Sequence, residues 1–375
     1  MHTRFLSVLS HRKSTIFVSA CLLASFCLIL LSRTAGGFAQ WYAVNVYPVF
    51  PNLIGRLSSL WDHSFFEAGI LLFIVMAAAL ILSGIAAVAF IRNSSGKAYG
   101  SFCLRFLSCV IAALMLVYSL TCAVNYQRDR IGAVLKLPET DLTEERLEAL
   151  CTLLAEDMTA LTEEPEWDYG RLSVNDTDYI EAEAVNSMQE LGRKEPSLSG
   201  YYPEPKPAYF SNLLSRFGIE GIFSPFTLEA NYNENMPTFL IPYTLCHELA
   251  HLKGYMREDD AGFIAYLACR NSPSPVFQYS GIFSALKFAL GALKSEASPE
   301  EFNKIYQSIP EPARIQLGTV QEQSAQGASS FMAVTKSVND LYLKANAQTG
   351  TKSYGGVVDL LIEDYAGRID KADLI

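Results

Sequence analysis

Cys246-His247-Glu248-Leu249-Ala250-His251-Leu252 is the stretch on which the interpretation of this chain depends. Its two histidines are four residues apart, so on an α-helix both imidazoles lie on one face and can bind the same ion. Glu248 follows the first histidine directly, where a carboxylate can accept a proton from water held by a metal. Zinc suits two neutral imidazoles and a carboxylate, with a fourth position left open. The spacing is typical of zinc peptidases.

The distribution of histidines supports this interpretation. The chain has five histidines, and only His247 and His251 come after Val124. Histidines scattered through that region would have made coincidence the simpler explanation. The competing interpretation is that both rings are ordinary core histidines satisfied by hydrogen bonds, because so short a pattern also occurs by chance.

Charge is distributed unevenly along the 375 residues. Residues 1–124 carry eight Lys and Arg and two acidic residues. Residues 125–375 carry 21 Lys and Arg and 37 Asp and Glu, which gives this part a net charge of −16. We therefore predict a membrane domain over 1–124 and an acidic extracytoplasmic domain over 125–375. No stretch clusters Lys and Arg as phosphate binding requires, so nucleic acid is not an expected partner.

Three apolar runs predict transmembrane helices, over residues 16–32, 68–91 and 106–124. Short cytoplasmic segments favour Lys and Arg, and the basic segments here are the N-terminal tail and residues 92–105. We therefore expect a cytoplasmic N-terminus and an outer domain that follows Val124. A cleaved signal peptide is the alternative for the first run. It would leave the topology unchanged, because the two later spans still return the chain to the outer side.

Periodicity and turn residues predict a mostly helical outer domain with a small sheet. Aromatic and β-branched residues in 221–232 predict one or two strands, which either form a rim along which a peptide extends or are purely structural. The metal-binding helix is predicted over 242–253. The stretch 47–60 is expected to be either a helix on the membrane surface or a loop. Further helices are predicted over 143–161, 176–191, 210–217, 258–270, 282–293, 299–307, 311–345 and 357–365.

The third protein ligand should be a carboxylate, because no other histidine is available. Gly254 allows a sharp turn after the metal-binding helix, so that the next helix can begin near the metal. That helix starts with three acids, Glu258, Asp259 and Asp260. Glu258 is the predicted ligand, since it lies at the turn and has the longer side chain, and Asp260 and Asp259 are the alternatives. Acids at a helix N-terminus also stabilise the helix dipole without any metal.

These residues predict a hydrolytic chemistry. Zinc would make a water molecule nucleophilic, while Glu248 accepts its proton and later passes it to the leaving amine. A group that stabilises the oxyanion is also expected, and Tyr255, Tyr279 and Tyr354 are the candidates. Elsewhere in the outer domain, a disulfide bridge between Cys246 and Cys269 stays open as an alternative to two core thiols.

The sequence around these residues resembles domain-of-unknown-function family 3810, a family of bacterial membrane proteins. The resemblance is carried by GIFSPFTLEA (221–230), by PYTLCHELAHLKGYMREDDAGFIAYLAC (242–269), and by Tyr279-Ser280-Gly281 and Ser353-Tyr354-Gly355. It implies N-terminal spans followed by a zincin-like domain. It also implies the usual zincin roles for His247, Glu248, His251 and Glu258.

One departure from the family pattern concerns the second helix. Family members tend to have Glu-Asp-Glu-Ala-Asn where this chain has Glu258-Asp259-Asp260-Ala261-Gly262. The shorter acid at position 260 favours Glu258 as the ligand. The missing asparagine removes a side chain that could support the metal ligands.

The predicted architecture is mainly α (α+β), with three N-terminal transmembrane helices followed by a zincin-like domain. The predicted function is a membrane-anchored zinc metallopeptidase acting on peptide or protein substrates outside the cytoplasmic membrane. The alternative is a non-catalytic zinc-binding protein that senses a signal or binds a partner. An intramembrane protease is disfavoured, because the apolar run 239–252 is too short for a span.

Overall fold

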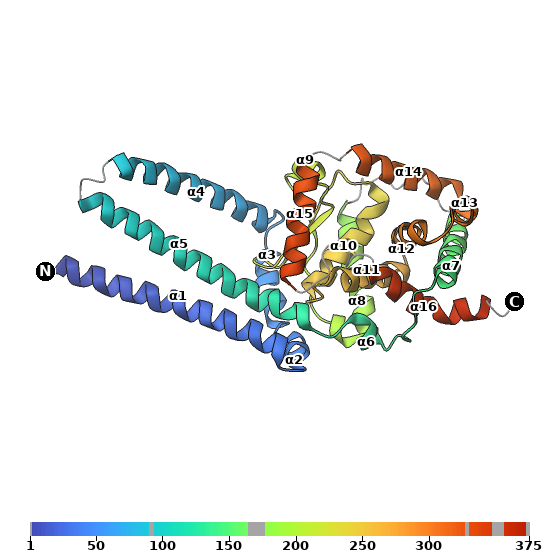
Figure 1. The fold of residues 1–375 in the computed structure, drawn as a ribbon, viewed down its shortest axis with the longest axis horizontal. Helices are drawn as coiled ribbons and strands as arrows, with labels where there is room; N and C mark the ends of the chain where they lie inside the picture. Colours follow the sequence, from blue (N-terminus) through green and yellow to red (C-terminus); the bar gives the residue numbers. More distant parts are fainter. Residues whose placement is uncertain (1, 90–93, 164–176, 327–329, 347–355, 373–375) are drawn as a thin grey trace.

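Three long apolar helices lie beside one another and extend from one side of the molecule (Figure 1). They are α1 (His2–Thr34), α4 (Phe65–Ala89) and α5 (Ser94–Thr121). Each contains a stretch long and apolar enough to cross a membrane, and α5 packs against both of the others. The run 16–32 is helical throughout, 68–91 is helical over its described residues to Ala89, and 106–124 is α-helical to Thr121. The computed structural model describes residues 2–89, 94–163, 177–326, 330–346 and 356–372.

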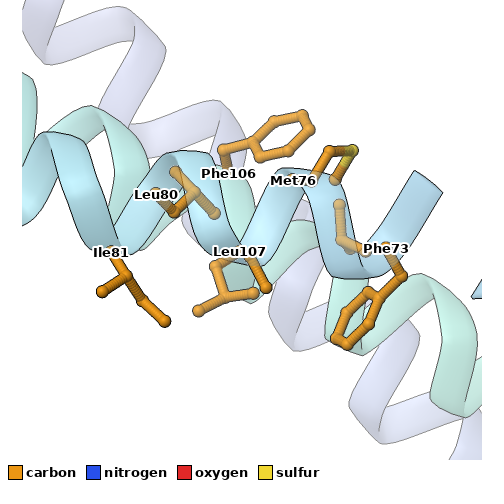
Figure 2. A pocket seen from close by; sticks show the side chains of 8 residues that line it. Phe73, Met76, Leu80, Ile81, Phe106 and Leu107 are labelled. Atoms are coloured by element: carbon orange, nitrogen blue, oxygen red, sulfur yellow. The ribbon is translucent and has the colours of Figure 1, made fainter. Parts of the chain in front are cut away.

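Much of the surface of these helices is apolar. Leu23, Leu72 and Leu104 each expose more than half of their surface. Apolar surface of this extent is costly in water and is matched to lipid, so the helices indicate association with a membrane. Between α4 and α5 lies a groove with an entirely apolar lining (Figure 2). It is lined by Phe73, Met76, Ala77, Leu80, Ile81, Phe106, Leu107 and Val110.

Short helical segments cover the end of this bundle where it meets the rest of the chain. The segment 47–60, predicted as a surface helix or a loop, forms a π-helical turn and one further short helical turn. Pro48 and Pro51 both lack an N–H, so a regular α-helix cannot run through the segment. The elements at this end are α2 (Phe38–Asn45), η1 (Pro51–Gly55), α3 (Arg56–Ser58) and η2 (Ala123–Gln127).

The remaining chain folds into a mainly helical domain with one small sheet, as predicted. Helices α10 (Ile241–Leu252) and α11 (Glu258–Arg270) pack against each other and against α12 (Pro275–Glu296). By length and composition α12 could also cross a membrane, but 67% of its apolar stretch is buried in protein, so it serves as a core helix. The other helices are α6 (Ile131–Leu135), α7 (Glu144–Thr162), α8 (Thr177–Lys194), η3 (Pro196–Leu198), α9 (Ser211–Phe217), η4 (Thr238–Leu240), α13 (Pro299–Ser308), α14 (Glu311–Gln326), α15 (Ser330–Ala345) and α16 (Gly356–Ala372).

The sheet has three strands in the order β1-β3-β2, so β2 forms one edge. Strands β2 (Gly221–Ser224) and β3 (Glu229–Tyr232) are antiparallel, with Gly221 opposite Tyr232 and Ser224 opposite Glu229. Strand β1 (Lys206–Pro207) runs parallel to β3 on its other side. The prediction of one or two strands in 221–232 is confirmed as two, and α10 packs against both of them.

One predicted helix is wrong. Residues 311–345 were expected to form a single long helix, but they form α14 and α15, which run in different directions (Figure 1). Gly327 lies between them in the sequence, and glycine costs about 1 kcal/mol relative to alanine in a helix interior. The other predicted helices of this domain are present, and their boundaries differ mainly by a few residues at each end, although α12 begins seven residues earlier and α16 ends seven residues later than predicted.

A buried ion pair fixes the sheet to the apolar helices. The Lys206 Nζ lies 2.7 Å from the Glu229 Oε1, and the two side chains are only 7% and 1% exposed. The Glu229 carboxylate also accepts hydrogen bonds from the backbone N–H groups of Phe65 and Phe66, at the start of α4. Lys206 in turn donates to the backbone carbonyl of Ser58. The sheet and the N-terminal end of α4 therefore share one hydrogen-bond network.

Removing one partner of this pair should be strongly destabilising. Lys206→Met leaves the Glu229 carboxylate buried without its cation, which typically costs about 3–5 kcal/mol. The double variant Lys206→Met/Glu229→Gln should recover part of the loss. The matched control is Lys344→Met, which breaks a more exposed pair with Asp340 and should cost about 0–1 kcal/mol. Thermal unfolding of the detergent-solubilised protein measures all three, and equal losses for the two single variants would contradict the role of the network.

Candidate metal centre

Helix α10, which carries His247 and His251, is held at both ends by contacts that its sequence provides. At its start, the backbone N–H of Tyr243 has no partner within the helix and donates to the Ser280 hydroxyl on α12 at 3.0 Å. Beside Ser280, a Cβ on Gly281 would lie 2.7 Å from the Cβ of Cys269, so only glycine lets α11 and α12 approach this closely. Ser280 and Gly281 of the Tyr279-Ser280-Gly281 motif therefore have structural roles, since Ser280 accepts a hydrogen bond from the start of α10 and Gly281 allows close helix packing.

At its end, α10 turns sharply through Gly254. This residue has φ of 85°, in the left-handed region, and a Cβ there would lie 3.1 Å from the Tyr47 ring. Both facts require glycine. The turn lets α11 begin with Glu258 close to the histidine face of α10, as the sequence predicted.

Three side chains from these two helices converge. The Glu258 Oε2 lies 3.2 Å from the His247 Nε2 and 3.7 Å from the His251 Nε2. One potential ligand atom from each residue lies within 4.8 Å of the other two. In a tetrahedral zinc site with bonds of about 2.0–2.1 Å, neighbouring ligand atoms lie roughly 3.3 Å apart. The spacing therefore fits zinc without rearrangement of the helices.

The orientation of His251 is set by a hydrogen bond. Its Nδ1 lies 2.7 Å from the backbone carbonyl oxygen of Tyr255. A carbonyl can only accept, so the Nδ1 carries a proton and the Nε2, which faces Glu258, is the nitrogen left for a metal ion to bind in place of its own proton. A ligand histidine whose second nitrogen donates to a carbonyl is a common arrangement in metal sites.

The alternative acids of α11 are engaged elsewhere. Arg130 lies with its Nη2 2.6 Å from Asp259 and its Nε 3.1 Å from Asp260. Asp260 also accepts from the backbone N–H of Ile131. Both aspartates therefore fix the segment that leads from the apolar helices into the domain, and only Glu258 remains available beside the histidines. Position 262 has no room for the asparagine of the family pattern, because a Cβ on Gly262 would lie 2.9 Å from the Tyr243 hydroxyl.

The electrostatics of the three residues favour a bound cation. Burial raises the pKa of Glu258, but hydrogen bonds to His247 and His251 outweigh burial and hold that pKa well below its ordinary range. Burial lowers the pKa of His251, whereas the Glu258 carboxylate raises it, to about 9 overall. A buried carboxylate that draws positive charge to itself in this way provides a setting that a divalent cation can also satisfy.

Glu248 lies next to the metal ligands and is buried. It faces β2 so closely that a Cβ on Gly221 would lie 2.5 Å from its Oε1, so glycine is needed at this point of the strand. The backbone N–H of Phe223, also in β2, interacts with the same carboxylate. Burial raises the pKa of Glu248 against the opposing effect of the two imidazoles. A raised pKa brings a carboxylate closer to the range useful for accepting and returning a proton.

The convergent site is partly open to solvent. The side chains of His247, His251 and Glu258 are 15%, 10% and 13% exposed. A closed structural zinc site uses four protein ligands, whereas a catalytic site keeps a position for water or substrate. Three candidate ligands with solvent access resemble a site that keeps one position open for water or substrate.

Residues 42–362 match a family model described as a protein of unknown function, DUF3810. The chain belongs to this family. The match covers the region from α2 to α16 and includes every residue of the candidate metal centre of this DUF3810 protein. No curated protein and no solved structure matches the chain.

Two of the three predicted oxyanion tyrosines have hydroxyls with hydrogen-bond partners outside the group of candidate ligands. The Tyr255 hydroxyl bonds to Ser197 at 2.7 Å, and the Tyr279 hydroxyl donates to Gln316 at 2.5 Å. Tyr354 lies outside the described residues. The sequence analysis missed Tyr243, whose ring centroid is 6.3 Å from that of His247. Its position four residues before His247, on the same helical face, was the available signal.

Cys246 and Cys269 are both buried, and both are free thiols. The disulfide alternative is therefore absent from this structure, and the two residues belong to the core behind α10 and α11. Neither belongs to the convergent group of candidate ligands.

The DUF3810 protein should bind one zinc ion per chain, and Glu258→Ala should weaken that binding by more than 100-fold because it removes a ligand. Asp259→Asn is the matched control, since that side chain contacts Arg130 instead and its substitution should leave zinc bound. Competition with a chelator, followed by elemental analysis, measures the affinity. Equal weakening by both substitutions would argue against Glu258 as the ligand.

Proposed function

We propose that this DUF3810 protein is a membrane-anchored zinc metallopeptidase that hydrolyses peptide bonds outside the cytoplasmic membrane. The observation that carries the proposal is one arrangement. His247, His251 and Glu258 each bring a potential ligand atom within 4.8 Å of the others, beside the buried carboxylate of Glu248. Two imidazoles, one carboxylate and a neighbouring carboxylate base are the components of metal-assisted hydrolysis.

In this proposal each residue has one task. His247, His251 and Glu258 would hold the zinc ion, which would supply Lewis acidity toward a substrate carbonyl and toward water. Glu248 accepts the proton from the attacking water and returns it to the leaving amine. Its raised pKa suits that exchange, and the Phe223 N–H holds the carboxylate in place. His251 is kept in the correct tautomer by the Tyr255 carbonyl.

The edge strand β2 supports a peptide as substrate. In an antiparallel pair, residues alternate between those that bond to the partner strand and those that face away from it. The Asn233 N–H donates to the Glu220 carbonyl, so by alternation Ile222 faces β3 while Gly221 and Phe223 face the free edge. An extended peptide can add to such an edge as a further strand, through groups other than the Phe223 N–H, which bonds to Glu248. Gly221 and Phe223 are also the residues that contact Glu248.

The membrane part of the proposal rests on α1, α4 and α5. Their apolar stretches are Arg12–Thr34, Phe65–Leu82 and Gly100–Gln127, and only 11%, 0% and 33% of them is buried in protein. α1 packs along α5, which favours a retained span over a cleaved signal peptide. The basic residues of the N-terminal tail and of 92–105 favour the cytoplasmic side. The metal centre then lies outside.

Glu248→Gln should separate the peptidase from a non-catalytic zinc protein. The amide keeps the size of the side chain but cannot accept the proton, so zinc should stay bound while hydrolysis falls by about 10²–10⁴-fold. Glu220→Gln, an exposed acid just before β2, is the matched control and should retain activity. Cleavage of an unstructured peptide library by the reconstituted protein, followed by mass spectrometry, gives both rates. Unchanged cleavage by Glu248→Gln would contradict the enzyme proposal and leave the sensory or partner-binding alternative.

The proposed topology has its own test. A reporter enzyme that is active only outside the cytoplasm should be active when fused after Gln127 and inactive when fused after Lys97. The basic residues near Lys97 retain that segment inside, and α5 then carries the chain across. The reverse pattern of activities would place the metal centre in the cytoplasm and overturn the topology.

A further inference from the structure

The turn that follows the metal-binding helix is attached to the ends of the apolar helices. The Tyr47 hydroxyl donates to the Leu252 carbonyl at 2.9 Å, and the Arg128 Nη1 donates to the Lys253 carbonyl at 3.0 Å. Leu252 and Lys253 come directly after His251. Tyr47 lies between α2 and η1, and Arg128 directly follows η2, so both come from the segments that cover the bundle end.

The other side of this turn packs on the same segments. Met256, two residues before Glu258, is buried in a cluster that includes Cys122 and Tyr126. Cys122 is the residue after the last one of α5. Glu258 is near enough to interact electrostatically with both Cys122 and Tyr126. The turn between the two helices of the candidate metal centre therefore packs against the end of an apolar helix.

The C-terminal end of the edge strand β2 also lies near the end of the helix bundle. Its Ser224 end is opposite Glu229, whose carboxylate binds the first N–H groups of α4. The hairpin loop that joins β2 to β3 lies against η1, since a Cβ on Gly55 would be 3.8 Å from the Leu228 carbonyl oxygen. The other end of β2, at Gly221, contacts Glu248. The free edge thus leads from the bundle end to the catalytic carboxylate over three residues, roughly 10 Å at 3.3 Å per residue.

At this junction α2, α3 and the start of α4 meet the domain (Figure 1), and the segments there carry exposed aromatic and apolar side chains. The start of α9 belongs to the same level, because the Glu67 carboxylate of α4 accepts from the backbone N–H groups of Tyr209 and Phe210. Trp and Tyr at such a position are typical of the boundary between membrane and water. The exposed side chains are Trp41, Val44, Val49, Leu53, Leu57, Leu60, Trp61, Tyr209, Phe210 and Leu213.

We propose that the substrates of this site are polypeptide segments adjacent to a membrane anchor, cut within about ten residues of the bilayer surface. The inference rests on the proposed peptidase function and names its substrate class. A segment that leaves the bilayer beside α4 meets the Ser224 end of β2 first and reaches Glu248 after a few residues. Anchoring also confines the substrate near the site, where effective concentrations reach the millimolar range.

The test uses the full-length protein in phosphatidylcholine–phosphatidylglycerol vesicles. One unstructured random peptide library is offered in three forms: fused to a transmembrane helix, attached to an acyl chain, and soluble. Each anchored form is made with the library directly after the anchor and with a spacer of about 30 Gly and Ser residues. Mass spectrometry locates and counts the cuts, and Glu248→Gln in the same vesicles gives the background.

Anchored libraries without the spacer should be cut at least tenfold faster than the soluble library, in residues close to the anchor, and the spacer should remove most of that advantage. Cleavage of either anchored form supports the proposal, and the two forms separate transmembrane from lipid anchors. Equal cleavage of soluble and anchored libraries, at sites independent of the anchor, would overturn it while leaving the peptidase function intact. If no library is cut above the Glu248→Gln background, both proposals fail together.

Discussion

The structure depends on one constraint: a buried carboxylate must lie against two imidazoles that come from a different helix. Glu258 can meet His247 and His251 only because the chain reverses within a few residues after α10, through the left-handed conformation of Gly254. A Cβ at that position would press on the Tyr47 ring. The same turn carries the Tyr255 carbonyl that orients His251. The conformation of Gly254, the orientation of His251 and the position of Glu258 therefore depend on the same turn.

The surroundings of the centre give it a fixed place relative to the apolar helices. On one side, the metal-binding helix ends on residues that follow α1 and α5, through the hydrogen bonds of Tyr47 and Arg128. On the other side, the sheet is joined to α4 through the pair of Lys206 and Glu229. Glu248 and the edge strand β2 lie between these two attachments. This arrangement fixes the candidate metal centre beside the apolar helices.

Much of this arrangement could be predicted from the sequence, because it is encoded locally. Histidines four residues apart on a helix, a glycine at its end and an acid at the start of the next helix specify a convergent site through helix geometry alone. The choice of Glu258 among three consecutive acids was also accessible, since it lies nearest the turn. The ion pairs of Asp259 and Asp260 with Arg130 could not be predicted, because Arg130 is more than a hundred residues away in the chain.

The remaining differences also have physical causes. The division of residues 311–345 into α14 and α15 was not evident from the glycine at 327, since α14 itself accommodates Gly318. Tyr243 lies within the family stretch 242–269, but its hydroxyl donates to the Gly262 carbonyl, a contact that no local pattern reveals. The two hydrogen bonds that hold the end of α10 against the bundle join residues 205 and 125 positions apart, and no local pattern reveals them.

The central claim is that two imidazoles and one carboxylate bind a single zinc ion. X-ray absorption at the zinc edge of the purified, zinc-loaded protein tests it most directly. The account predicts two imidazole nitrogens at about 2.0–2.1 Å, with oxygen ligands completing the coordination. A sulfur ligand at about 2.3 Å, which would bring Cys246 or another thiol into the site, or the absence of imidazole, would contradict it.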